Sequence, residues 1–373
     1  MKIAFDAKRA FYNSSGLGNY SRNTILLLEK YFNQNEYYLV TPSIKKTDLF
    51  NYSKDFKVII PSYINRKFFK RFWRSYLIVN ELQKQNIEIY HGLSNELPVN
   101  INKSKAKSIV TIHDLIFLRY PQLYKSHDRY IYKNKFKYSC NVADRIIAVS
   151  EQTKEDIIKY FNINEQKIDV VYQGCNSLFY NKIDSQAKEK IRNKYKLPLK
   201  YLLYVGTVEE RKNLFLIIKA LKEGKIDIPL VVAGKSTKYI DLIKKYISEY
   251  NLKDQVFFYH NVYFDDLPCF YQLAEMLIYP SIYEGFGIPI LEALVSKTPV
   301  ITSTGSCFKE TGGNSTIYID PNSIDNLIEA INKILSDNDL KNKMIVDGYE
   351  HAKKFSDDKI AENIMSVYKK VLN

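Results

Sequence analysis

Short hydrophobic runs rich in β-branched and aromatic residues recur along the chain, and most are followed by a stretch with helical spacing. In the first part of the chain the runs are KIAFD, YYLV, KVII, IEIYHG, KSIVTIHD, RIIAVS and IDVVY. After a pause they resume as YLLYVG, LVVAG, VFFY, MLIYPS, VITS and TIYID. Strand patterns that alternate with helical ones are typical of parallel sheets with crossover helices. The sequence therefore predicts an α/β fold.

The pause falls over residues 174–200, a polar stretch rich in Lys and Asn. We expect a linker there, between an amino-terminal domain (1–173) and a carboxyl-terminal domain (201–354). A last helix, 355–373, is expected to cross back to the amino-terminal domain. Two doubly wound, Rossmann-like domains would face a central cleft lined by the carboxyl ends of their strands, where such sheets bind ligands.

Composition narrows the class of protein. The 373 residues are 46% hydrophobic, which indicates a globular chain. No run of eighteen apolar residues occurs, and the start MKIAFDAKRAF lacks a signal peptide's apolar region, so we expect a cytoplasmic protein. The cysteines are far apart and form no CxxC pair, which predicts reduced, mostly buried thiols; they are Cys140, Cys175, Cys269 and Cys307.

The formal charge of +14 favours an anionic partner, although a Lys-rich composition alone produces the same value. In residues 66–76 basic side chains, including Arg66, Arg71 and Arg74, interleave with aromatic ones. One interpretation is a helix at the anionic inner face of the cell membrane. The other is a solvated helix whose aromatic side chains pack on their own domain. A more distant alternative for the whole chain is a basic nucleic-acid-binding protein.

The stretch YPSIYEGFGIPILEALVSKTPVITS, residues 279–303, reads as a buried strand, a turn over Glu284–Ile288 and a helix. Glycines in the turn let a ligand approach the backbone, and the free amides at the helix start favour an anion. Glu284 and Glu292 flank these amides, and carboxylates accept hydrogen bonds from vicinal hydroxyls. A ligand with both phosphate and hydroxyls is a nucleotide-sugar. The alternative is that Glu284 caps the helix and Glu292 is exposed.

Two further strand-to-helix turns carry candidate donor-binding residues. Gly16 and Gly18 follow the first strand and precede a helix that is expected to begin around Asn19. Arg211 and Lys212 follow the strand YLLYVG, where adjacent cations suit a diphosphate. The alternative for the second pair is two surface cations in a loop.

His113 follows the apolar strand SIVTI, at a carboxyl end, where Asp114 could orient it. The alternative is a structural histidine. The Asp337 and Asp339 pair in SDNDL has the spacing of a metal-binding Asp-x-Asp motif, but it lies between two late helices and reads as helix capping. We therefore expect no metal site.

Five blocks occur in the order and spacing of retaining glycosyltransferases of family 4, which the chain resembles over nearly its whole length. They are Gly16 to Gly18, TIHDL, ADRIIAVSE, VGTVEERKN and the E-x7-E of Glu284 and Glu292. This resemblance implies the two-domain GT-B fold, with an acceptor side in the first domain and nucleotide-sugar binding in the second. FDAKRAF and SGLGNYSR are most similar to the mannosyltransferase-like branch.

The implied activity is a retaining, metal-independent transfer of a hexose, without a cofactor, to a growing glycan or lipid-linked glycan in bacterial surface-polysaccharide biosynthesis. GDP-mannose is the first expectation for the donor, and a UDP-sugar the second. A sugar-nucleotide epimerase of the same fold is the alternative enzyme.

The resemblance also implies roles for residues. His113 would orient the reacting sugar as a hydrogen-bond donor, Glu284 would hold that sugar, and Glu292 would bind the donor ribose. Thr207 stands where many members have Arg, so one diphosphate cation is either absent or supplied elsewhere, for example by Lys235. The full donor-binding set is Gly16, Gly18, Gly206, Arg211, Lys212, Lys235, Gly285, Phe286, Gly287, Ile288 and Glu292.

Overall fold

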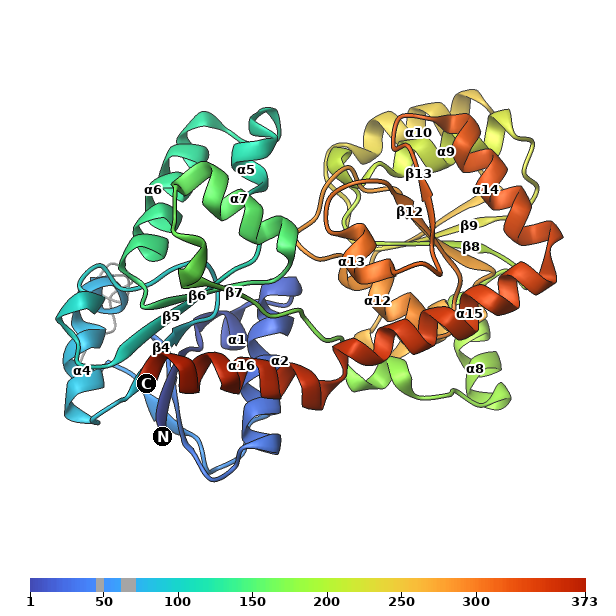
Figure 1. Ribbon diagram of the computed structural model, residues 1–373. Helices are drawn as coiled ribbons and strands as arrows, with labels where there is room; N and C mark the ends of the chain where they lie inside the picture. The colour runs from blue at the N-terminus through green and yellow to red at the C-terminus, as the bar shows by residue number, and fades with distance from the viewer. Residues whose placement is uncertain (45–49, 62–71) are drawn as a thin grey trace. The chain divides into compact units, whose positions relative to one another are not determined.

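The computed structural model describes residues 1–44, 50–61 and 72–373, which form two compact units (Figure 1). The first unit contains Met1–Gly174 and Ser356–Asn373, and the second contains Cys175–Phe355. Each unit is built on one parallel sheet, and each of the hydrophobic runs quoted above contains a strand. The predicted α/β class, with two Rossmann-like sheets, is confirmed.

The first sheet has the strand order β3-β2-β1-β4-β5-β6-β7. Its strands are β1 (Lys2–Asp6), β2 (Glu36–Val40), β3 (Lys57–Ile59), β4 (Ile89–Gly92), β5 (Lys107–Ile112), β6 (Arg145–Ala148) and β7 (Ile168–Val170). Successive side chains of a strand point to opposite faces. In β1, Ile3 and Phe5 accordingly join one hydrophobic cluster and Ala4 joins the other. Both faces of the sheet are therefore buried, as parallel sheets require.

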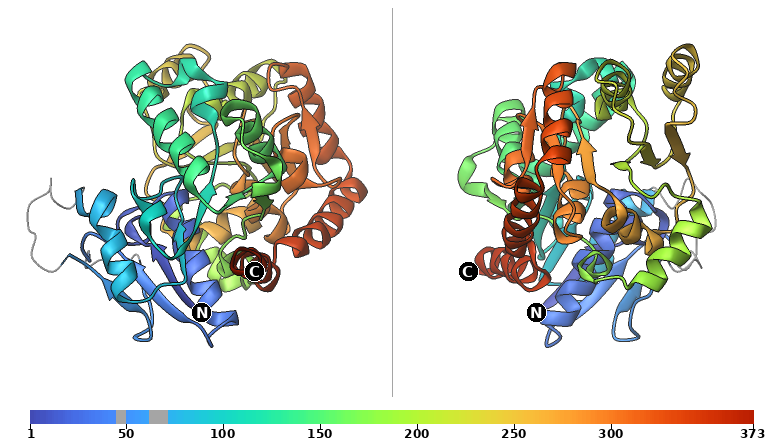
Figure 2. Two further views of the ribbon diagram at one scale, coloured as in Figure 1. Left: turned by 60° about the vertical axis from the view of Figure 1, so that its left-hand side comes forward. Right: turned by 90° about the vertical axis from the view of Figure 1, so that its right-hand side faces the viewer.

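Helices cover both faces of this sheet. They are α1 (Lys8–Tyr12), α2 (Gly16–Tyr31), η1 (Trp73–Leu77, a π-helical turn), α4 (Ile78–Lys84), α5 (Ile116–Arg119), α6 (Ser126–Val142), α7 (Glu151–Phe161) and α16 (Asp357–Leu372), with short 3-10 turns η2 (Ile101–Lys103), η3 (Pro121–Leu123) and η4 (Glu165–Lys167). Helix α16 packs along α2, and the chain ends lie close together on this unit in all views (Figures 1 and 2).

The second sheet has the order β10-β9-β8-β11-β12-β13. Its strands are β8 (Leu202–Val205), β9 (Leu230–Ala233), β10 (Val256–Tyr259), β11 (Met276–Tyr279), β12 (Val300–Ser303) and β13 (Ile317–Ile319). Its helices are η5 (Ser177–Tyr180), α8 (Ser185–Tyr195), η6 (Glu210–Lys212), α9 (Leu214–Glu223), α10 (Ile240–Glu249), η7 (Phe264–Asp266), α11 (Leu267–Leu273), α12 (Ile288–Val295), α13 (Phe308–Gly312), α14 (Ile324–Ser336), α15 (Asn338–Ala352) and η8 (Lys353–Phe355).

The stretch 174–200, expected as a linker, is ordered as η5 and α8, and from Cys175 onward it belongs to the second unit. Helix α8 has no buried residue, which explains why its sequence is polar throughout. Asp184 caps it, because its side chain accepts a hydrogen bond from the Ala187 amide. A surface helix of this kind leaves little hydrophobic periodicity for a sequence reading to detect.

The segment 66–76 lies partly outside the described residues, which resume at Phe72. Trp73 is buried, and Arg74 forms ion pairs with Asp6 and Glu96. Both side chains therefore pack within the first unit. Phe72 and Tyr76 are exposed. The interpretation of residues 66–76 as a membrane-binding helix is therefore wrong for Trp73 and Arg74, which are not available to a membrane surface.

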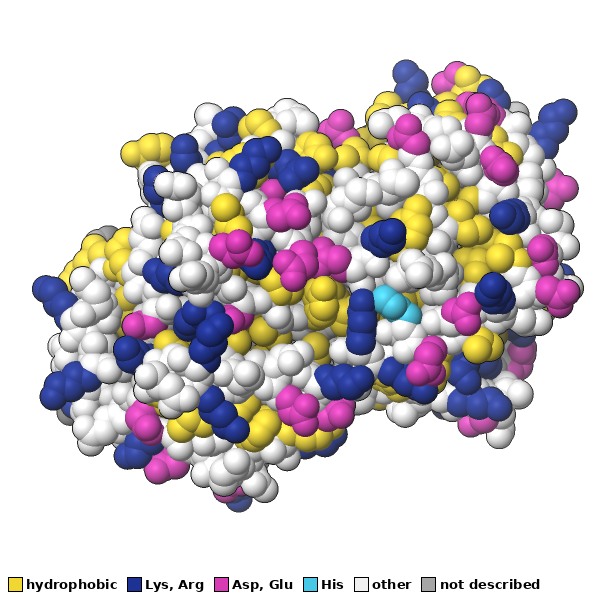
Figure 3. Space-filling model, in the orientation of Figure 1, with side chains coloured by type: hydrophobic (Ala, Val, Ile, Leu, Met, Phe, Trp, Pro, Cys, Tyr) yellow, Lys and Arg dark blue, Asp and Glu magenta, His cyan; other side chains and the backbone are white. Residues whose placement is uncertain are grey.

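All four cysteines are buried thiols, as predicted. None of the helices in the described part of the chain has the length and apolarity that a bilayer crossing requires. On the face seen in Figure 3, Lys and Arg side chains are scattered among Asp and Glu and form no continuous basic stripe. This pattern gives no support on that face to the nucleic-acid alternative.

Candidate functional site

The predicted donor-binding residues of the second unit lie on loops that leave β8, β9 and β11. Parallel strands present their carboxyl ends at one edge of a sheet, so these loops share an edge. Glu284 follows β11, η6 with Arg211 and Lys212 follows β8, and Lys235 follows β9. The loop from β12 to α13 adds Ser306, whose hydroxyl donates to the Glu284 carbonyl at 2.9 Å and accepts from the Glu284 amide at 3.2 Å.

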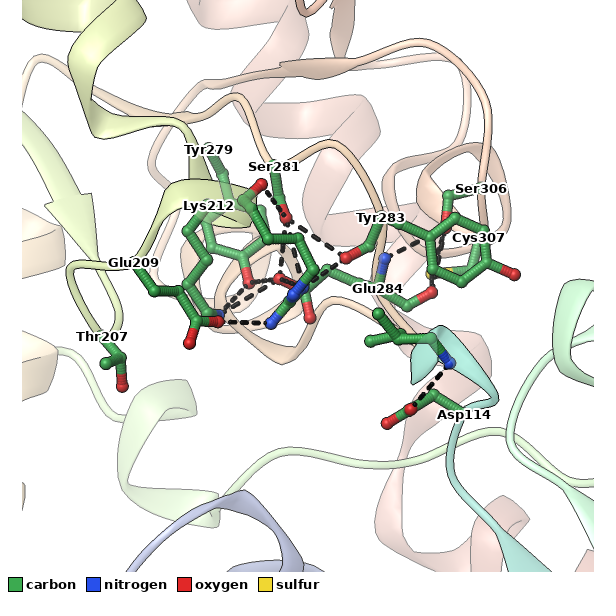
Figure 4. A network of polar contacts seen from close by, with 12 residues as sticks. Asp114, Thr207, Glu209, Lys212, Tyr279, Ser281, Tyr283, Glu284, Ser306 and Cys307 are labelled. Carbon is green, nitrogen blue, oxygen red and sulfur yellow. Dashed lines mark hydrogen bonds and ion pairs between the residues drawn. The ribbon is translucent and has the colours of Figure 1, made fainter. Parts of the chain in front are cut away.

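The Glu284 carboxylate is the centre of a buried polar network (Figure 4). Its Oε1 atom has four contacts: Arg211 Nη1 at 2.7 Å, Tyr279 OH at 2.7 Å, Ser281 Oγ at 2.9 Å and Lys212 Nζ at 3.2 Å. The side chain of Glu284 is 13% exposed. Both predicted cations are thus brought together with the predicted carboxylate.

Arg211 has further partners within the same loops. Its Nη2 donates to Glu209 Oε1 at 2.6 Å, and its Nη1 donates to the Tyr283 carbonyl. Lys212 Nζ also donates to the Tyr279 hydroxyl at 2.7 Å. The interpretation of these two residues as isolated surface cations is wrong, because their side chains are only 12% and 14% exposed.

Glu284 is held in its charged form. Burial by itself would raise the pKa of this carboxyl, but Lys212 and Arg211, with hydrogen bonds from Tyr279 and Ser281, lower it to about 2. A buried carboxylate that receives charge-assisted hydrogen bonds has a fixed position and a fixed charge. Such a group can orient a polyhydroxyl ligand without rearrangement.

Glu292 lies within α12, and the alternative of an exposed helix residue is wrong. It is 8% exposed, and its Oε2 accepts a hydrogen bond from the Tyr271 hydroxyl at 2.7 Å. Burial raises its pKa to about 7, although Tyr271 and the more distant charge of Lys212 oppose the shift. This carboxyl is therefore poised to change charge near neutral pH.

The turn before α12 has the backbone that the sequence predicts. Gly287 is the residue before the helix and has φ of 92°, a conformation that favours glycine. Ile288 begins the helix and Pro289 occupies its first turn, as expected from proline's missing N–H. The Phe286 carbonyl accepts a hydrogen bond from Thr311, which ties the turn to α13.

The loops after β8 and β9 touch through their backbones. Gly206 donates from its amide to Ala233, and a Cβ atom on Gly234 would lie 2.0 Å from the Gly206 carbonyl oxygen. Glycine is therefore required at residue 234, a position that the sequence reading missed. Lys235 follows it directly, and its carbonyl accepts a hydrogen bond from Val208.

Several residues that hold Glu284 and Glu292 were not anticipated. Tyr279 and Ser281 lie inside the stretch that drew attention to Glu284, where they read as part of a buried strand. Tyr271 and Ser306 lie on α11 and on the loop after β12, and nothing in their local sequence distinguishes them from structural polar residues.

In the first unit, Gly16 and Gly18 occupy the first turn of α2, which begins earlier than the expected start at Asn19. His113 follows β5 and is buried. Its Nε2 lies 2.9 Å from the Leu93 carbonyl, so Nε2 carries the proton and donates it. Asp114 accepts a hydrogen bond from the Ile116 amide.

The His113 ring is neutral at pH 7, because burial lowers its pKa to about 4. With the single N–H of a neutral imidazole directed at Leu93, the other nitrogen, Nδ1, can only accept a hydrogen bond. The expected role as a donor to the sugar would need the ring to leave Leu93. In the present arrangement Nδ1 can accept a hydrogen bond from a sugar hydroxyl.

In the part of the chain that the structure describes, His, Cys, Asp and Glu side chains form no group of three that could hold a metal ion. Asp337 caps α15, since its side chain accepts a hydrogen bond from the Leu340 amide, and the helix-capping interpretation is confirmed for Asp337; Asp339 lies in the first turn of the helix. Metal independence stays a prediction.

Two Rossmann-like parallel sheets, the second with a carboxylate and two cations at its carboxyl edge, define a protein of the GT-B class. Family models match both parts of the chain: Glycosyltransferase Family 4 matches residues 15–177, and Glycosyl transferases group 1 matches residues 186–351. The chain therefore belongs to the glycosyltransferases of family 4.

Among curated relatives, the chain is 29% identical over 287 residues to O-antigen chain mannosyltransferase B of Escherichia coli, a match that covers 75% of this chain and 74% of the relative. It is 34% identical over 229 residues to O-antigen chain mannosyltransferase RfbU of Salmonella typhimurium, which covers 60% of each protein. The matched part is thus well short of the relatives' full length.

Solved structures share the fold at low identity. A glycosyltransferase from Rickettsia africae superimposes with a TM-score of 0.77 at 19% identity, covering 100% of this chain and 98% of that chain. WaaG, a glycosyltransferase involved in lipopolysaccharide biosynthesis, gives 0.74 at 16% identity, with coverage of 98% and 99%. Anabaena HepE in complex with UDP and glucose gives 0.77 at 14% identity, with 99% of each chain covered.

Proposed function

We propose that this chain transfers a hexose from a nucleoside-diphosphate sugar to a growing glycan or lipid-linked glycan, with retention of configuration and without a metal ion. GDP-mannose is the proposed donor. The proposed process is the assembly of a bacterial surface polysaccharide. The two O-antigen mannosyltransferases among the relatives support the choice of sugar and process.

The observation that carries this proposal is the Glu284 site. A carboxylate held in its charged form lies beside the start of α12, next to Arg211 and Lys212. The helix amides and the cations favour a diphosphate, and they would stabilise the negative charge that develops when the nucleoside diphosphate leaves. The carboxylate would hold hydroxyls of the sugar. A phosphate ligand without hydroxyls would leave the carboxylate unused.

A thermal-shift panel of GDP-, UDP-, dTDP- and ADP-sugars tests the donor. A ligand at 100 times its dissociation constant stabilises the folded chain by about 2.7 kcal/mol, so the correct donor should give the largest shift. We expect GDP-mannose to do so, with and without EDTA. Stabilisation by RNA and by no nucleotide would contradict the proposal, and a shift that EDTA abolishes would contradict metal independence. A donor whose sugar is converted without an acceptor would favour the epimerase.

We further propose peripheral contact with anionic membrane through residues 66–76. Because Arg74 pairs with Asp6 and Glu96, the test must spare it. The test variant replaces Arg66, Lys67, Lys70 and Arg71 with Gln. At about 1 kcal/mol per basic residue near an acidic surface, it should lose most binding to acidic liposomes, while donor binding is retained.

The matched control removes the same charge from exposed positions of the second unit, by changing Lys182, Lys190, Lys196 and Lys200 to Gln. This control should bind acidic liposomes as the parent does. Equal binding by the test variant and the parent would refute the membrane contact.

A further inference from the structure

A network of buried hydrogen bonds connects the last helix of the first unit to α2. Tyr368 of α16 contacts His91 of β4, whose Nδ1 lies 2.6 Å from the Tyr368 hydroxyl. The other ring nitrogen of His91, Nε2, lies 2.8 Å from Thr111 Oγ1 of β5. The Thr111 hydroxyl also lies 3.0 Å from the hydroxyl of Tyr20 on α2. These consecutive contacts, here called the α16–α2 network, cross the first sheet from one strand to the next.

The network ends against His113, the candidate sugar-binding histidine. The rings of Tyr20 and His113 meet edge to face, with their centroids 4.6 Å apart and their planes at 89°. On another side, the His113 ring is held by its hydrogen bond to the Leu93 carbonyl. An edge-to-face contact favours one orientation of the two rings. The position of the Tyr20 ring therefore helps to set the orientation of the His113 ring.

The side chains of the network are shielded from water. His91, Thr111 and Tyr368 are 0% exposed, and Tyr20 is 8% exposed. Burial lowers the pKa of His91 to about 3, so its ring is neutral at pH 7. A buried polar group that loses its partner cannot turn to solvent instead. A change at one end of the network must therefore be met by its other members.

The hydroxyl protons indicate the direction of donation. If Tyr368 donates to Nδ1, the neutral His91 ring carries its proton on Nε2 and donates it to Thr111. Thr111 then donates to Tyr20, and Tyr20 donates to Thr24, with which it also forms a hydrogen bond. In the opposite direction His91 would donate to Tyr368, whose own proton would have no acceptor among the residues that the structure describes. Donation from Tyr368 towards Tyr20 is therefore favoured.

We propose that Tyr368 is a positioning residue for His113, which it reaches through the α16–α2 network. The proposal rests on the proposed function, because it gives α16 a part in orienting the side chain that would contact the transferred sugar. Tyr368 itself contacts no substrate. Its hydroxyl holds His91, His91 holds Thr111, and Thr111 holds the tyrosine that packs on His113.

The first test is nuclear magnetic resonance of the full chain with ¹⁵N-labelled histidines at pH 7. In the parent, His91 and His113 should both carry their proton on Nε2. Tyr368→Phe removes only a hydroxyl group, and it should shift the ring signals of His113 as well as those of His91. An unchanged His113 signal, or a parent whose His91 carries its proton on Nδ1, would overturn the proposal.

Tyr37→Phe is the matched control for this variant. Tyr37 lies in the same hydrophobic core as Tyr368, is 4% exposed and donates its hydroxyl proton to the Leu28 carbonyl, outside the network. Both variants lose one buried hydrogen bond, so urea unfolding should show similar losses of stability. The control should leave the His113 signals in place. Equal shifts of His113 in both variants would overturn the proposal, because any loosening of the core would then suffice.

Calorimetric titrations with GDP-mannose and with GDP test the consequence for the sugar. GDP has no hexose, so only the affinity for GDP-mannose should depend on His113. Tyr368→Phe should bind GDP-mannose about fivefold more weakly than the parent and should bind GDP equally well.

A second variant, Tyr20→Phe, keeps the ring on His113 but interrupts the same network. It should also weaken GDP-mannose binding about fivefold, and the double variant with Tyr368→Phe should bind no more weakly than either single variant. Effects that add in the double variant would show that the two hydroxyls act separately, and the proposal would be wrong.

The titrations also distinguish failure of this proposal from failure of the proposed function. A parent chain that binds neither GDP nor any other donor nucleotide would refute the proposed function, and the histidine signals would then decide the positioning role by themselves. If the parent binds GDP-mannose and Tyr368→Phe binds it as tightly, the positioning role alone is overturned. An equal loss of affinity for GDP and GDP-mannose in Tyr368→Phe would also overturn it.

Discussion

Glu284 and Glu292 are two buried carboxyls of one turn-and-helix segment, and their ionisation is opposite. The pKa of Glu284 is lowered to about 2, whereas that of Glu292 is raised to about 7. Their exposures are similarly small, 13% for the side chain of Glu284 and 8% for Glu292. Burial therefore does not explain the difference.

The partners explain it. Glu284 contacts two cations and two hydroxyls, which compensate for the water that it has lost. Glu292 accepts a hydrogen bond from the neutral Tyr271 hydroxyl and lies farther from Lys212 than Glu284 does. The first carboxyl is a permanent charge that the protein has built in. The second can become neutral, and a ligand that donates hydrogen bonds would favour its charged form.

The largest effect is expected for Glu284→Gln, which leaves the buried Lys212 without its carboxylate and Arg211 with only the more exposed Glu209. Breaking a buried ion pair by removing one partner costs about 3 to 5 kcal/mol, so urea unfolding should show a loss of this size. Turnover should fall more than the donor Michaelis constant rises, because Glu284 would position the reacting sugar.

Glu209→Gln is the comparison variant. Glu209 also contacts Arg211, but its side chain is 36% exposed, so the variant should cost no more than about 1 kcal/mol. Equal losses in both variants would show that Glu284 is not the centre of the network.

The second effect is a pH dependence of stability that Glu292 causes. Its ordinary pKa is 4.5 and its folded pKa is about 7, so the folded state binds the proton more tightly. The stabilisation is present below pH 4.5 and is lost as the pH rises through 7, with a total of about 3 kcal/mol.

Glu292→Gln cannot ionise and should lack this loss. The measurement is the difference in unfolding free energy between parent and variant from pH 4.5 to 8, in which the contributions of groups common to both proteins, such as His113, cancel. A constant difference across that range would show that Glu292 is charged throughout, like Glu284.

The third effect concerns the ligand. If Glu292 accepts hydrogen bonds from the donor ribose, Glu292→Ala should weaken binding of the free nucleoside diphosphate by about 10- to 150-fold, which corresponds to 1.5 to 3 kcal/mol. Binding to the parent should strengthen as the pH rises through 7, since the charged carboxylate is the better acceptor. Unchanged affinity in the variant would exclude the ribose contact.

The smallest effect is expected for Tyr271→Phe, which removes the hydrogen bond to Glu292 and little else. At pH 5 the loss of stability should be about 1 kcal/mol, and it should grow at pH 8, where the hydroxyl donates to a charged group. Tyr130→Phe, at a 70% exposed tyrosine, is the control that should change neither value. A loss of stability that is equal at pH 5 and pH 8 would show that Glu292 does not gain a charge between these two pH values.

Much of the fold follows from local sequence. Every quoted hydrophobic run contains a strand. A strand that is buried on both faces is a nearly continuous hydrophobic run, so it can be recognised from its own residues and the turns at its ends. The turn with Gly287 and Pro289 was equally readable, since each residue type has a backbone preference. The polar helix α8 was missed, because it buries no side chain.

The site was only partly readable, because its electrostatics depend on distant residues. Tyr271 is 21 positions before Glu292, and Asp6 is 68 positions before Arg74. A spacing motif identifies the carboxylates but carries no record of which cation or hydroxyl reaches them. The charge states of Glu284 and Glu292, and the ion pairs of Arg74 with Asp6 and Glu96, therefore required the folded structure.

The return of α16 to the first unit has a consequence for how the protein is made. Residues of α16, including Ile364 and Tyr368, belong to the hydrophobic core of the first unit, and Tyr368 lies 2.6 Å from His91 Nδ1. A ribosome completes the whole second unit before it makes these residues. The second unit, Cys175–Phe355, is continuous and can fold as it emerges, whereas the first unit must wait, partly assembled, until residues 356–373 arrive. The unit that is synthesised first is therefore the last to be finished.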